Sequence, residues 1–193
     1  MPICLSDIYP LKSGRYHEVT GAGSYSFAAI CCGVTSGTVL WFVEGWMSEV
    51  VNPIGLQCYC DPQRLLIGKC SNAADVLAVA EEALRSSSSS LVVAELTKPL
   101  TLTAGRRLQL AAEAGSSTGL MIVREDMGSN ATQTRWRISP TYSPDDSTHM
   151  QWELIKNKSG TVGSWRIRWN DEARRISVVS EPVQRTQYAH KAH

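Results

Sequence analysis

The fold is decided by the stretch Tyr16-His17-Glu18-Val19-Thr20-Gly21-Ala22-Gly23-Ser24, a short strand that runs into a glycine-rich turn. The small and apolar residues from Tyr25 to Gly33 predict a buried helix after the turn. We expect Ser24 to cap this helix and Gly33 to end it. A strand, a glycine-rich turn and a helix in this order are the local context of a nucleotide-binding phosphate loop.

Further strands and helices alternate up to about residue 123 of the chain. Continuous apolar runs predict strands at 38–43, 64–67, 91–96 and 119–123. Helical spacing predicts helices at 73–85, capped by Ser71 or Asn72, and at 103–114, capped by Thr103. Alternation of this kind predicts α/β architecture, with a mainly parallel twisted sheet flanked by helices.

The pattern changes from Gln133 onward. Apolar and polar residues alternate at 134–138, 150–156, 164–169 and 176–179, and this alternation is typical of strands with one solvated face. We therefore expect C-terminal antiparallel strands that extend the sheet. A single domain is predicted over residues 1–180, with a disordered polar tail at 181–193.

Length, composition and charge indicate where the protein acts and what kind of partner it binds. No apolar run among the 193 residues approaches the roughly 20 residues that a membrane span needs. The first residues also lack the layout of a secretory signal, so we expect a cytoplasmic protein without a membrane partner. Residues 1–100 hold six Lys and Arg against nine Asp and Glu, whereas residues 101–193 hold thirteen against nine. The basic second half points mildly to an anionic partner.

The glycine-rich turn departs from a working phosphate loop. Such a loop follows G-x-x-x-x-G-K-[ST], in which amides cradle the phosphates, the lysine neutralises them and the hydroxyl binds Mg²⁺. Gly21, Gly23 and Ser24 are present, but the lysine and the Ser or Thr after it are missing, and Tyr25 and Phe27 stand near their places. Because the lysine is central to phosphoryl transfer, we predict a degenerate loop, no ATP hydrolysis and no cofactor.

Other candidate chemistry is weaker still. Glu95 ends the 91–96 strand, where a second nucleotide motif would lie, but without a phosphate loop a plain strand-end acid is favoured. The four histidines show no fixed spacing to a nucleophile, so no catalytic residue is predicted. Cys58, Cys60 and Cys70 could begin a metal site, but a fourth ligand is missing nearby, and free thiols without a metal are favoured.

The second half also interleaves basic and aromatic residues. In the 164–169 strand, Trp165 and Trp169 share one face and Arg166 and Arg168 the other. Core tryptophans under a solvated basic face are the favoured interpretation, and a surface for DNA or an acidic partner stays open. The candidate residues for a partner or DNA surface are Arg106, Arg107, Arg135, Arg137, Lys156, Lys158, Arg166 and Arg168.

Several of these stretches resemble the RecA core. The similar segments are Glu18-Val19-Thr20-Gly21, Val92-Val93-Ala94-Glu95, and a late hairpin with the Lys156-Asn157-Lys158 turn. The closer resemblance is to the inducible mutagenesis protein A (ImuA) family of bacterial RecA-like proteins. It lies in His17-Glu18-Val19, in Leu40-Trp41 with Asn52-Pro53 and Gly55-Leu56, in residues 106–113, and in Thr134-Arg135-Trp136-Arg137.

This resemblance implies a RecA-like fold with degenerate nucleotide motifs and a role in the SOS response to DNA damage. Members act in damage-induced mutagenesis, alongside a Y-family-like polymerase homologue and an error-prone polymerase. The resemblance therefore implies a non-catalytic accessory protein that supports translesion DNA synthesis through contacts with these proteins or with RecA, with DNA as a further possible partner. In active RecA-like ATPases an acid follows the second strand, and Glu44 lies near that place but one residue out of register.

Two alternatives come from other functional classes. A SulA-type inhibitor of cell division, acting on FtsZ, would also resemble RecA without its nucleotide loop. Inhibition of FtsZ polymerisation would favour that alternative. A nucleotide-dependent DNA-binding enzyme is the second alternative, and micromolar binding of ATP with Mg²⁺ would favour it.

Overall fold

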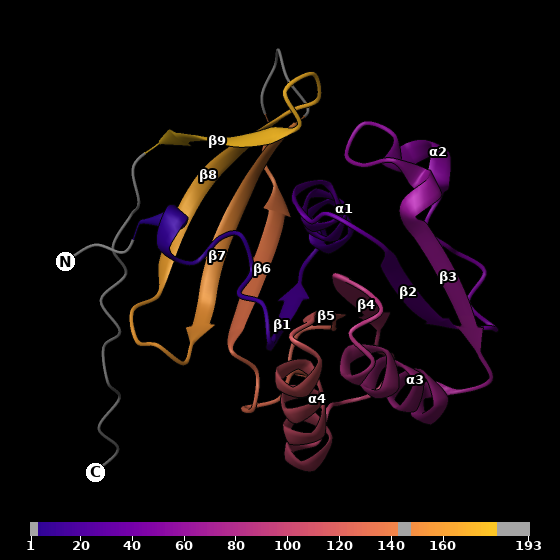
Figure 1. The fold of residues 1–193 in the computed structure, drawn as a ribbon. Coiled ribbons are helices and arrows are strands. Elements are labelled where there is room, and N and C mark those ends of the chain that lie inside the picture. The colour runs from indigo at the N-terminus through magenta and orange to yellow at the C-terminus, as the bar shows by residue number, and fades with distance from the viewer. Residues whose placement is uncertain (1–3, 143–147, 181–193) are drawn as a thin grey trace, which may run out of the picture.

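The computed structural model describes residues 4–142 and 148–180. Within them, one continuous nine-stranded sheet has the order β3-β2-β4-β5-β1-β6-β7-β8-β9 (Figure 1). The strands are β1 (Arg15–Thr20), β2 (Val39–Glu44), β3 (Leu65–Cys70), β4 (Leu91–Glu95), β5 (Thr118–Ile122), β6 (Thr134–Pro140), β7 (His149–Asn157), β8 (Gly163–Asn170) and β9 (Arg175–Ser180). The helices are α1 (Ser24–Val34), α2 (Pro53–Leu56), α3 (Ala73–Arg85) and α4 (Leu102–Gly115), with short 3₁₀ turns η1 (Leu5–Asp7) and η2 (Pro62–Arg64).

The first six strands form the parallel part of the sheet, and helices cover both of its faces (Figure 1). Successive residues of a strand point to opposite faces, so β4 serves two apolar cores. Val93 packs in the core that includes α1, whereas Val92 and Ala94 pack in the core under α3 and α4. The predicted mainly parallel sheet flanked by helices is confirmed.

The last three strands extend the sheet in antiparallel fashion, as predicted. The direction expected for residues 134–138 was partly wrong, because β6 pairs with β1 in parallel and only with β7 in antiparallel fashion. Alternation reports that one face of a strand is solvated, and it carries no information on the direction of the neighbouring strand. One face of β6, β7 and β8 carries the buried Trp136, Trp152 and Trp165. Trp136 and Trp152 meet Phe27 of α1 and each other, and Trp165 meets Trp136.

The ends of α1 differ from the prediction. The residue before the helix is Gly23, which makes no side-chain capping bond, and Ser24 is the first helical residue. The helix also continues past Gly33 to Val34. A Cβ atom at Gly33 would lie 2.5 Å from the carbonyl oxygen of Tyr59, so this glycine allows another segment to approach closely.

Caps explain where the other two long helices begin. Asn72 caps α3 as predicted, because its side chain accepts hydrogen bonds from the amides of Ala74 and Asp75. Thr101 caps α4 by accepting from the amide of Ala104, so the predicted cap at Thr103 was wrong by two residues.

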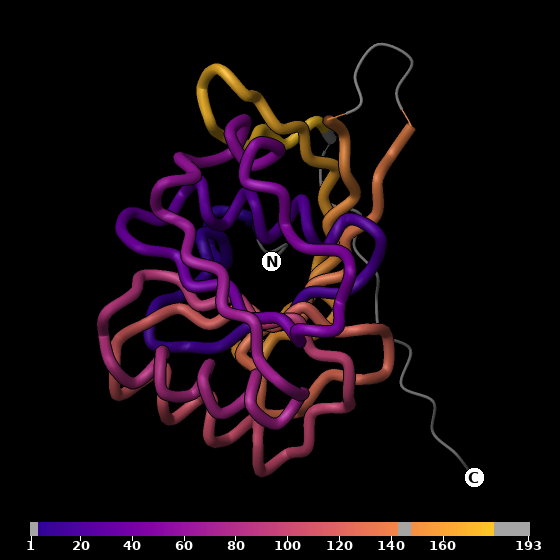
Figure 2. The backbone as a smooth tube through the Cα atoms, turned by 90° about the vertical axis from the view of Figure 1, so that its right-hand side faces the viewer, coloured from indigo at the N-terminus to yellow at the C-terminus, as the bar shows by residue number. Residues whose placement is uncertain are grey.

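Helices α3 and α4 lie far from the C-terminal strands β8 and β9. In both backbone views α3 and α4 lie side by side, away from the β8–β9 end of the sheet (Figures 1 and Figure 2). In the described residues, no helix is long and apolar enough to cross a membrane. The tail predicted at 181–193 lies outside the described residues.

Candidate functional site

The glycine-rich turn between β1 and α1 packs directly on β6. The amide of Gly23 donates to the carbonyl oxygen of Ile138 at 3.0 Å, and the amide of Ser24 donates to the carbonyl oxygen of Gly21 at 3.1 Å. Gly21 has a φ of +91°, and a Cβ atom there would lie 2.4 Å from the Ile138 carbonyl oxygen. The glycines therefore allow a close backbone approach. Two amides of the turn are already bonded to carbonyl groups of the chain itself.

Tyr25, the residue after the turn, reaches across to the end of β4. Its hydroxyl donates to one carboxylate oxygen of Glu95 at 2.6 Å, and the indole N–H of Trp41 donates to the other at 2.7 Å. The rings of Tyr25 and Trp41 stack with centroids 6.4 Å apart. Burial, together with the hydrogen bond to Glu95, raises the pKa of Tyr25, so the phenol stays a neutral donor. The structure thus brings the predicted loop and the predicted second motif together.

Glu44 ends the neighbouring strand β2 and is also held by hydrogen bonds. Thr97 donates to one of its carboxylate oxygens, and the indole N–H of Trp46 donates to the other at 2.8 Å. The bond from Thr97 and then that from Trp46 lower the pKa of Glu44, so the carboxylate is ionised at neutral pH. Hydrogen bonds from protein side chains therefore engage both oxygens of each strand-end acid.

The donor sets near this edge do not assemble a metal centre. Across the described ranges 4–142 and 148–180, no group of three or more His, Cys, Asp or Glu side chains is placed to hold a metal ion. Of the cysteines singled out by spacing, Cys58 is exposed, Cys60 is buried and Cys70 is half-buried. The strand-end acids can accept hydrogen bonds and hold neighbouring side chains in place.

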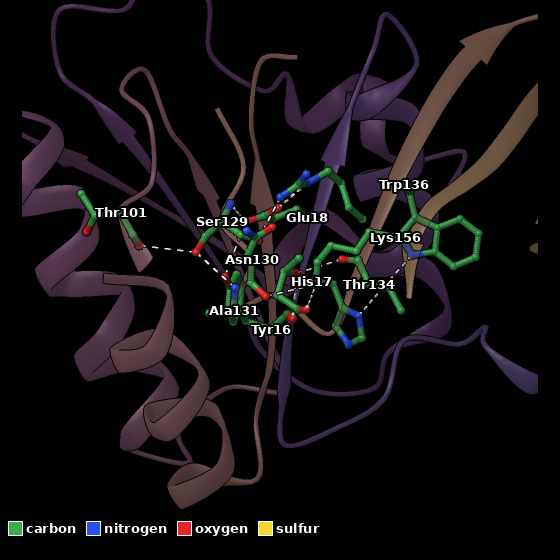
Figure 3. A network of polar contacts seen from close by, with 12 residues as sticks. Tyr16, His17, Glu18, Thr101, Ser129, Asn130, Ala131, Thr134, Trp136 and Lys156 are labelled. Carbon is green, nitrogen blue, oxygen red and sulfur yellow. Dashed lines mark hydrogen bonds and ion pairs between the residues drawn. The ribbon is translucent and has the colours of Figure 1, made fainter. Parts of the chain in front are cut away.

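A buried polar network between β1 and β6 was missed at the level of the sequence (Figure 3). Glu18 is fully buried, and Arg135 donates to its carboxylate through Nε at 2.7 Å. The amide of Ser129 donates to the other oxygen at 2.8 Å, and the Arg135 guanidinium also donates to the Ser129 carbonyl at 2.9 Å. Burial raises the pKa of Glu18, while the bonds from Ser129 and Arg135 act in the opposite direction. The charged Glu18 inside the short predicted strand was the available signal, because a charge that becomes buried must have a partner.

His17 anchors the other side of the same strand (Figure 3). Its Nε2 lies 3.1 Å from the carbonyl oxygen of Lys12, which can only accept, so Nε2 carries the proton. Its Nδ1 then accepts from the Thr134 hydroxyl at 2.6 Å, and that hydroxyl oxygen accepts from the Trp136 indole at 2.9 Å. Burial lowers the pKa of His17 to about 4, so this imidazole is neutral and structural at neutral pH.

The candidate basic residues on β6 and β7 all make contacts within the fold. Arg135 belongs to the Glu18 pair described above. Lys156 donates to the carbonyl oxygens of Asn130 and Thr132 at 3.1 and 3.0 Å, and burial lowers its pKa. Arg137 lies 2.9 Å from Glu125 and 3.5 Å from Glu153, near the surface.

The remaining candidates fall into three separate places. Arg166 and Arg168 lie on β8, on the face opposite the tryptophans, and Lys158 is exposed in the turn after β7. Arg106 and Arg107 are exposed on α4, where Arg107 pairs with Glu81 of α3 at 2.8 Å. The structure therefore places Arg166 and Arg168 together opposite the beginning of β7, and separates them from Lys158 beyond the end of β7 and from the α4 pair.

The sequence of the chain is similar to that of a known bacterial protein. No protein-family model matches the chain. Protein ImuA of Caulobacter vibrioides, in two strains, is 31% identical to it over 188 residues. The match covers 82% of this chain and 76% of each relative.

Proposed function

This chain belongs to the ImuA family, and from that premise we propose that it is a non-catalytic accessory protein of the SOS response. In this proposal it supports damage-induced mutagenesis and translesion DNA synthesis through protein contacts. The partners are a Y-family-like polymerase homologue, an error-prone polymerase and RecA, whose fold the chain is proposed to share. Family membership supports the general role, and the geometry of the strand ends supports the absence of catalysis.

The contact between Tyr25 and Glu95 carries the proposal that no ATP is hydrolysed. The phenol donates to the acid that a second nucleotide motif would offer to Mg²⁺, at 2.6 Å. Phosphoryl transfer depends on a cation and a metal at the phosphates. The turn holds no lysine, and the amides of Gly23 and Ser24 are bonded to carbonyl groups. These contacts favour a structural role for the turn over a role in binding nucleotide.

A protein-contact surface is proposed on the outward face of α4. The inward face of this helix packs through Leu108 and Ala111 on the sheet. The outward face presents Arg106 beside Leu110, whose side chain is 66% exposed. A large exposed apolar side chain next to an arginine is typical of interface centres, where Arg is enriched and charged pairs are few.

A pull-down with assembled RecA filaments tests the proposal. We expect the wild-type chain to be retained and Leu110→Glu to lose at least about tenfold of the retained protein, because a charge would be buried in the interface. Ile54→Glu is the matched control, since Ile54 is 73% exposed on α2, far along the chain from α4. Unchanged melting temperatures would show that both variants fold.

Failure of the wild-type chain to bind the filaments, or equal losses for the two variants, would count against the proposed contact. Hydrolysis of ATP by the purified chain above the rate of a mock preparation would count against a non-catalytic role.

A further inference from the structure

The strands β6–β9 have one covered and one open face. Trp136, Trp152 and Trp165 point to the core that contains α1, the helix that packs against these strands. The side chains between them point the other way. In Figure 1, α3 and α4 lie over the parallel part of the sheet, away from β7, β8 and β9. Their side of the sheet is therefore left open over the C-terminal strands.

Four arginines from three strands gather on that open side, and we call this surface the arginine face: Arg137, Arg166, Arg168 and Arg175. The register of the strands places them in one array. Arg137 of β6 lies opposite Glu153 of β7, and Glu153 lies opposite Ser164 of β8. Arg166 and Arg168 follow Ser164 along β8, at alternate positions that face the same side. Arg175 lies opposite Asn170 at the next outward position of β8. Arginines two residues apart on a strand are separated by about 7 Å.

The charge on this face is one-sided. Of the side chains that the described parts of β6–β9 direct outward, Glu153 is the one carboxylate, and it lies 3.5 Å from Arg137. Glu125, from outside these strands, also pairs with Arg137, at 2.9 Å. Arg168 and Arg175 are exposed to solvent. Arg166 donates to the carbonyl oxygen of Tyr142, and no carboxylate pairs with it among the residues that the structure describes. A polyanion is the complementary partner, and guanidinium groups suit the paired oxygens of phosphates.

The position of Tyr142 favours a nucleic acid over other polyanions as the partner. It follows β6 at the border of the arginine face, where its carbonyl oxygen lies 3.5 Å from the Arg166 guanidinium, and its side chain is 86% exposed. An exposed aromatic ring on a residue that borders cations is suited to stack on an unpaired base. The described strands offer the surface of a sheet, without a helix that could enter a duplex groove.

We propose that the arginine face binds the phosphate backbone of single-stranded DNA, with Tyr142 stacking on an unpaired base at its border. The inference rests on the proposed role in damage-induced mutagenesis for the choice of DNA. It places the nucleic acid on the C-terminal strands and leaves α4 for the protein partner.

Fluorescence anisotropy of a labelled oligo-dT of about 20 nucleotides tests the proposal with the full chain, since single-strand sites span several nucleotides. We expect saturable binding that weakens as salt rises. The double variant Arg168→Gln and Arg175→Gln should bind about tenfold more weakly at low salt. It should also lower the magnitude of the salt slope by about 1.4, because each phosphate contact on a single strand contributes about 0.7.

A matched control removes two charges elsewhere. Lys69→Gln with Arg85→Gln changes two exposed cations on β3 and α3, and it should leave the affinity and the salt slope unchanged. Tyr142→Ala should weaken binding about fivefold or more, whereas Tyr142→Phe should retain it, because stacking needs the ring and not the hydroxyl. Urea unfolding of each variant shows whether it folds. Arg166→Gln is a further single substitution within the arginine face, independent of the double variant.

Three results would overturn the proposal. They are an equal loss of affinity for the control pair and the arginine-face pair, equal competition by polyglutamate and by unlabelled oligo-dT, or tighter binding of a duplex of the same length. The RecA pull-down separates this failure from failure of the proposed function, because Arg168→Gln with Arg175→Gln should still be retained on the filaments.

Discussion

The glycine-rich turn before α1 and the arginine face of β6–β9 differ in what their polar groups contact. At the turn, the amides of Gly23 and Ser24 and the carboxylate of Glu95 are bonded to groups of the chain itself. On the arginine face, Arg175 is exposed to solvent. A site that binds an outside molecule needs polar groups that can reach it. The comparison therefore assigns a structural role to the turn and a binding role to the C-terminal strands.

Strand β6 shows the same division within a few residues. Arg135 pairs with the fully buried Glu18, whereas Arg137, two residues later, pairs with Glu125 and Glu153 near the surface. The two arginines point to the same side of the sheet. The two arginines differ in burial. Arg135 joins the buried network of Glu18 and Ser129, whereas the side chain of Arg137 is partly exposed to solvent. Residue type and strand position alone would not distinguish them.

The largest effect is expected when the buried pair is broken. Arg135→Gln should lower the free energy of unfolding by about 4 kcal/mol, because the Glu18 carboxylate would stay buried without its cation. Arg175→Gln, a change of the same kind on the arginine face, should cost less than about 0.5 kcal/mol. Urea unfolding followed by circular dichroism measures both. Similar losses for the two variants would remove the distinction between the buried and the open arginines.

The next effect concerns the close approach of the turn to β6. Gly21→Ala should destabilise the chain by about 3 kcal/mol, because the added Cβ meets the Ile138 carbonyl and the left-handed backbone is strained. Gly14→Ala provides the control: it also has a positive φ, +68°, but the nearest atoms to its Cβ position lie 3.9 Å away. Strain alone should cost about 1 kcal/mol there. If both variants unfold at the same urea concentration, the turn does not depend on close packing.

A smaller effect should appear as a dependence of stability on pH. The pKa of His17 is about 4 in the folded chain, below its ordinary value of 6.5, so the unfolded chain binds the proton more readily. His17 therefore contributes stability above pH 6.5 that is lost as the pH falls towards 4. Between pH 7.5 and pH 5 the loss should be about 2 kcal/mol. Glu18, whose folded pKa is raised, contributes in the opposite sense, because its term is lost as the pH rises.

Comparison with His17→Gln isolates the histidine from other titrating groups. Unfolding at both pH values should show a loss that is about 2 kcal/mol smaller in the variant than in the wild type. Equal losses in the two proteins would mean that His17 is protonated in the folded chain.

The smallest effect is expected at the contact that closes the turn. Tyr25→Phe removes one hydrogen bond to Glu95 and should cost about 1 kcal/mol. Tyr142→Phe removes an exposed hydroxyl and should have almost no effect on unfolding. No difference between these variants would indicate that the Tyr25 hydroxyl contributes nothing to the closed turn.

Much of this fold follows from local patterns in the sequence. Buried strands such as Leu91–Glu95 have continuous apolar runs, and α3 has both its cap, Asn72, and its helical spacing. The tryptophan and arginine faces of β8 follow from alternation, and burial confirms them for Trp165, Ile167 and Trp169. These features depend on neighbours in the chain, which the sequence shows directly.

The contacts of the candidate site depend on residues that are far apart in the chain. Glu18 and Arg135 are separated by 117 positions, and Tyr25 and Glu95 by 70. Spacing could mark Gly21 and Gly23 as unusual, but it could not show that Ile138 occupies the space beside them. Such pairings are set by the order of strands in the sheet, which single-sequence patterns do not specify.

Equilibrium dialysis of the full chain against ATP with Mg²⁺ tests the closed turn most directly. Because the turn lacks the lysine and Tyr25 bonds to Glu95, we expect no saturable binding up to millimolar nucleotide. One equivalent of ATP bound at micromolar concentration, and lost when Mg²⁺ is removed, would contradict the account.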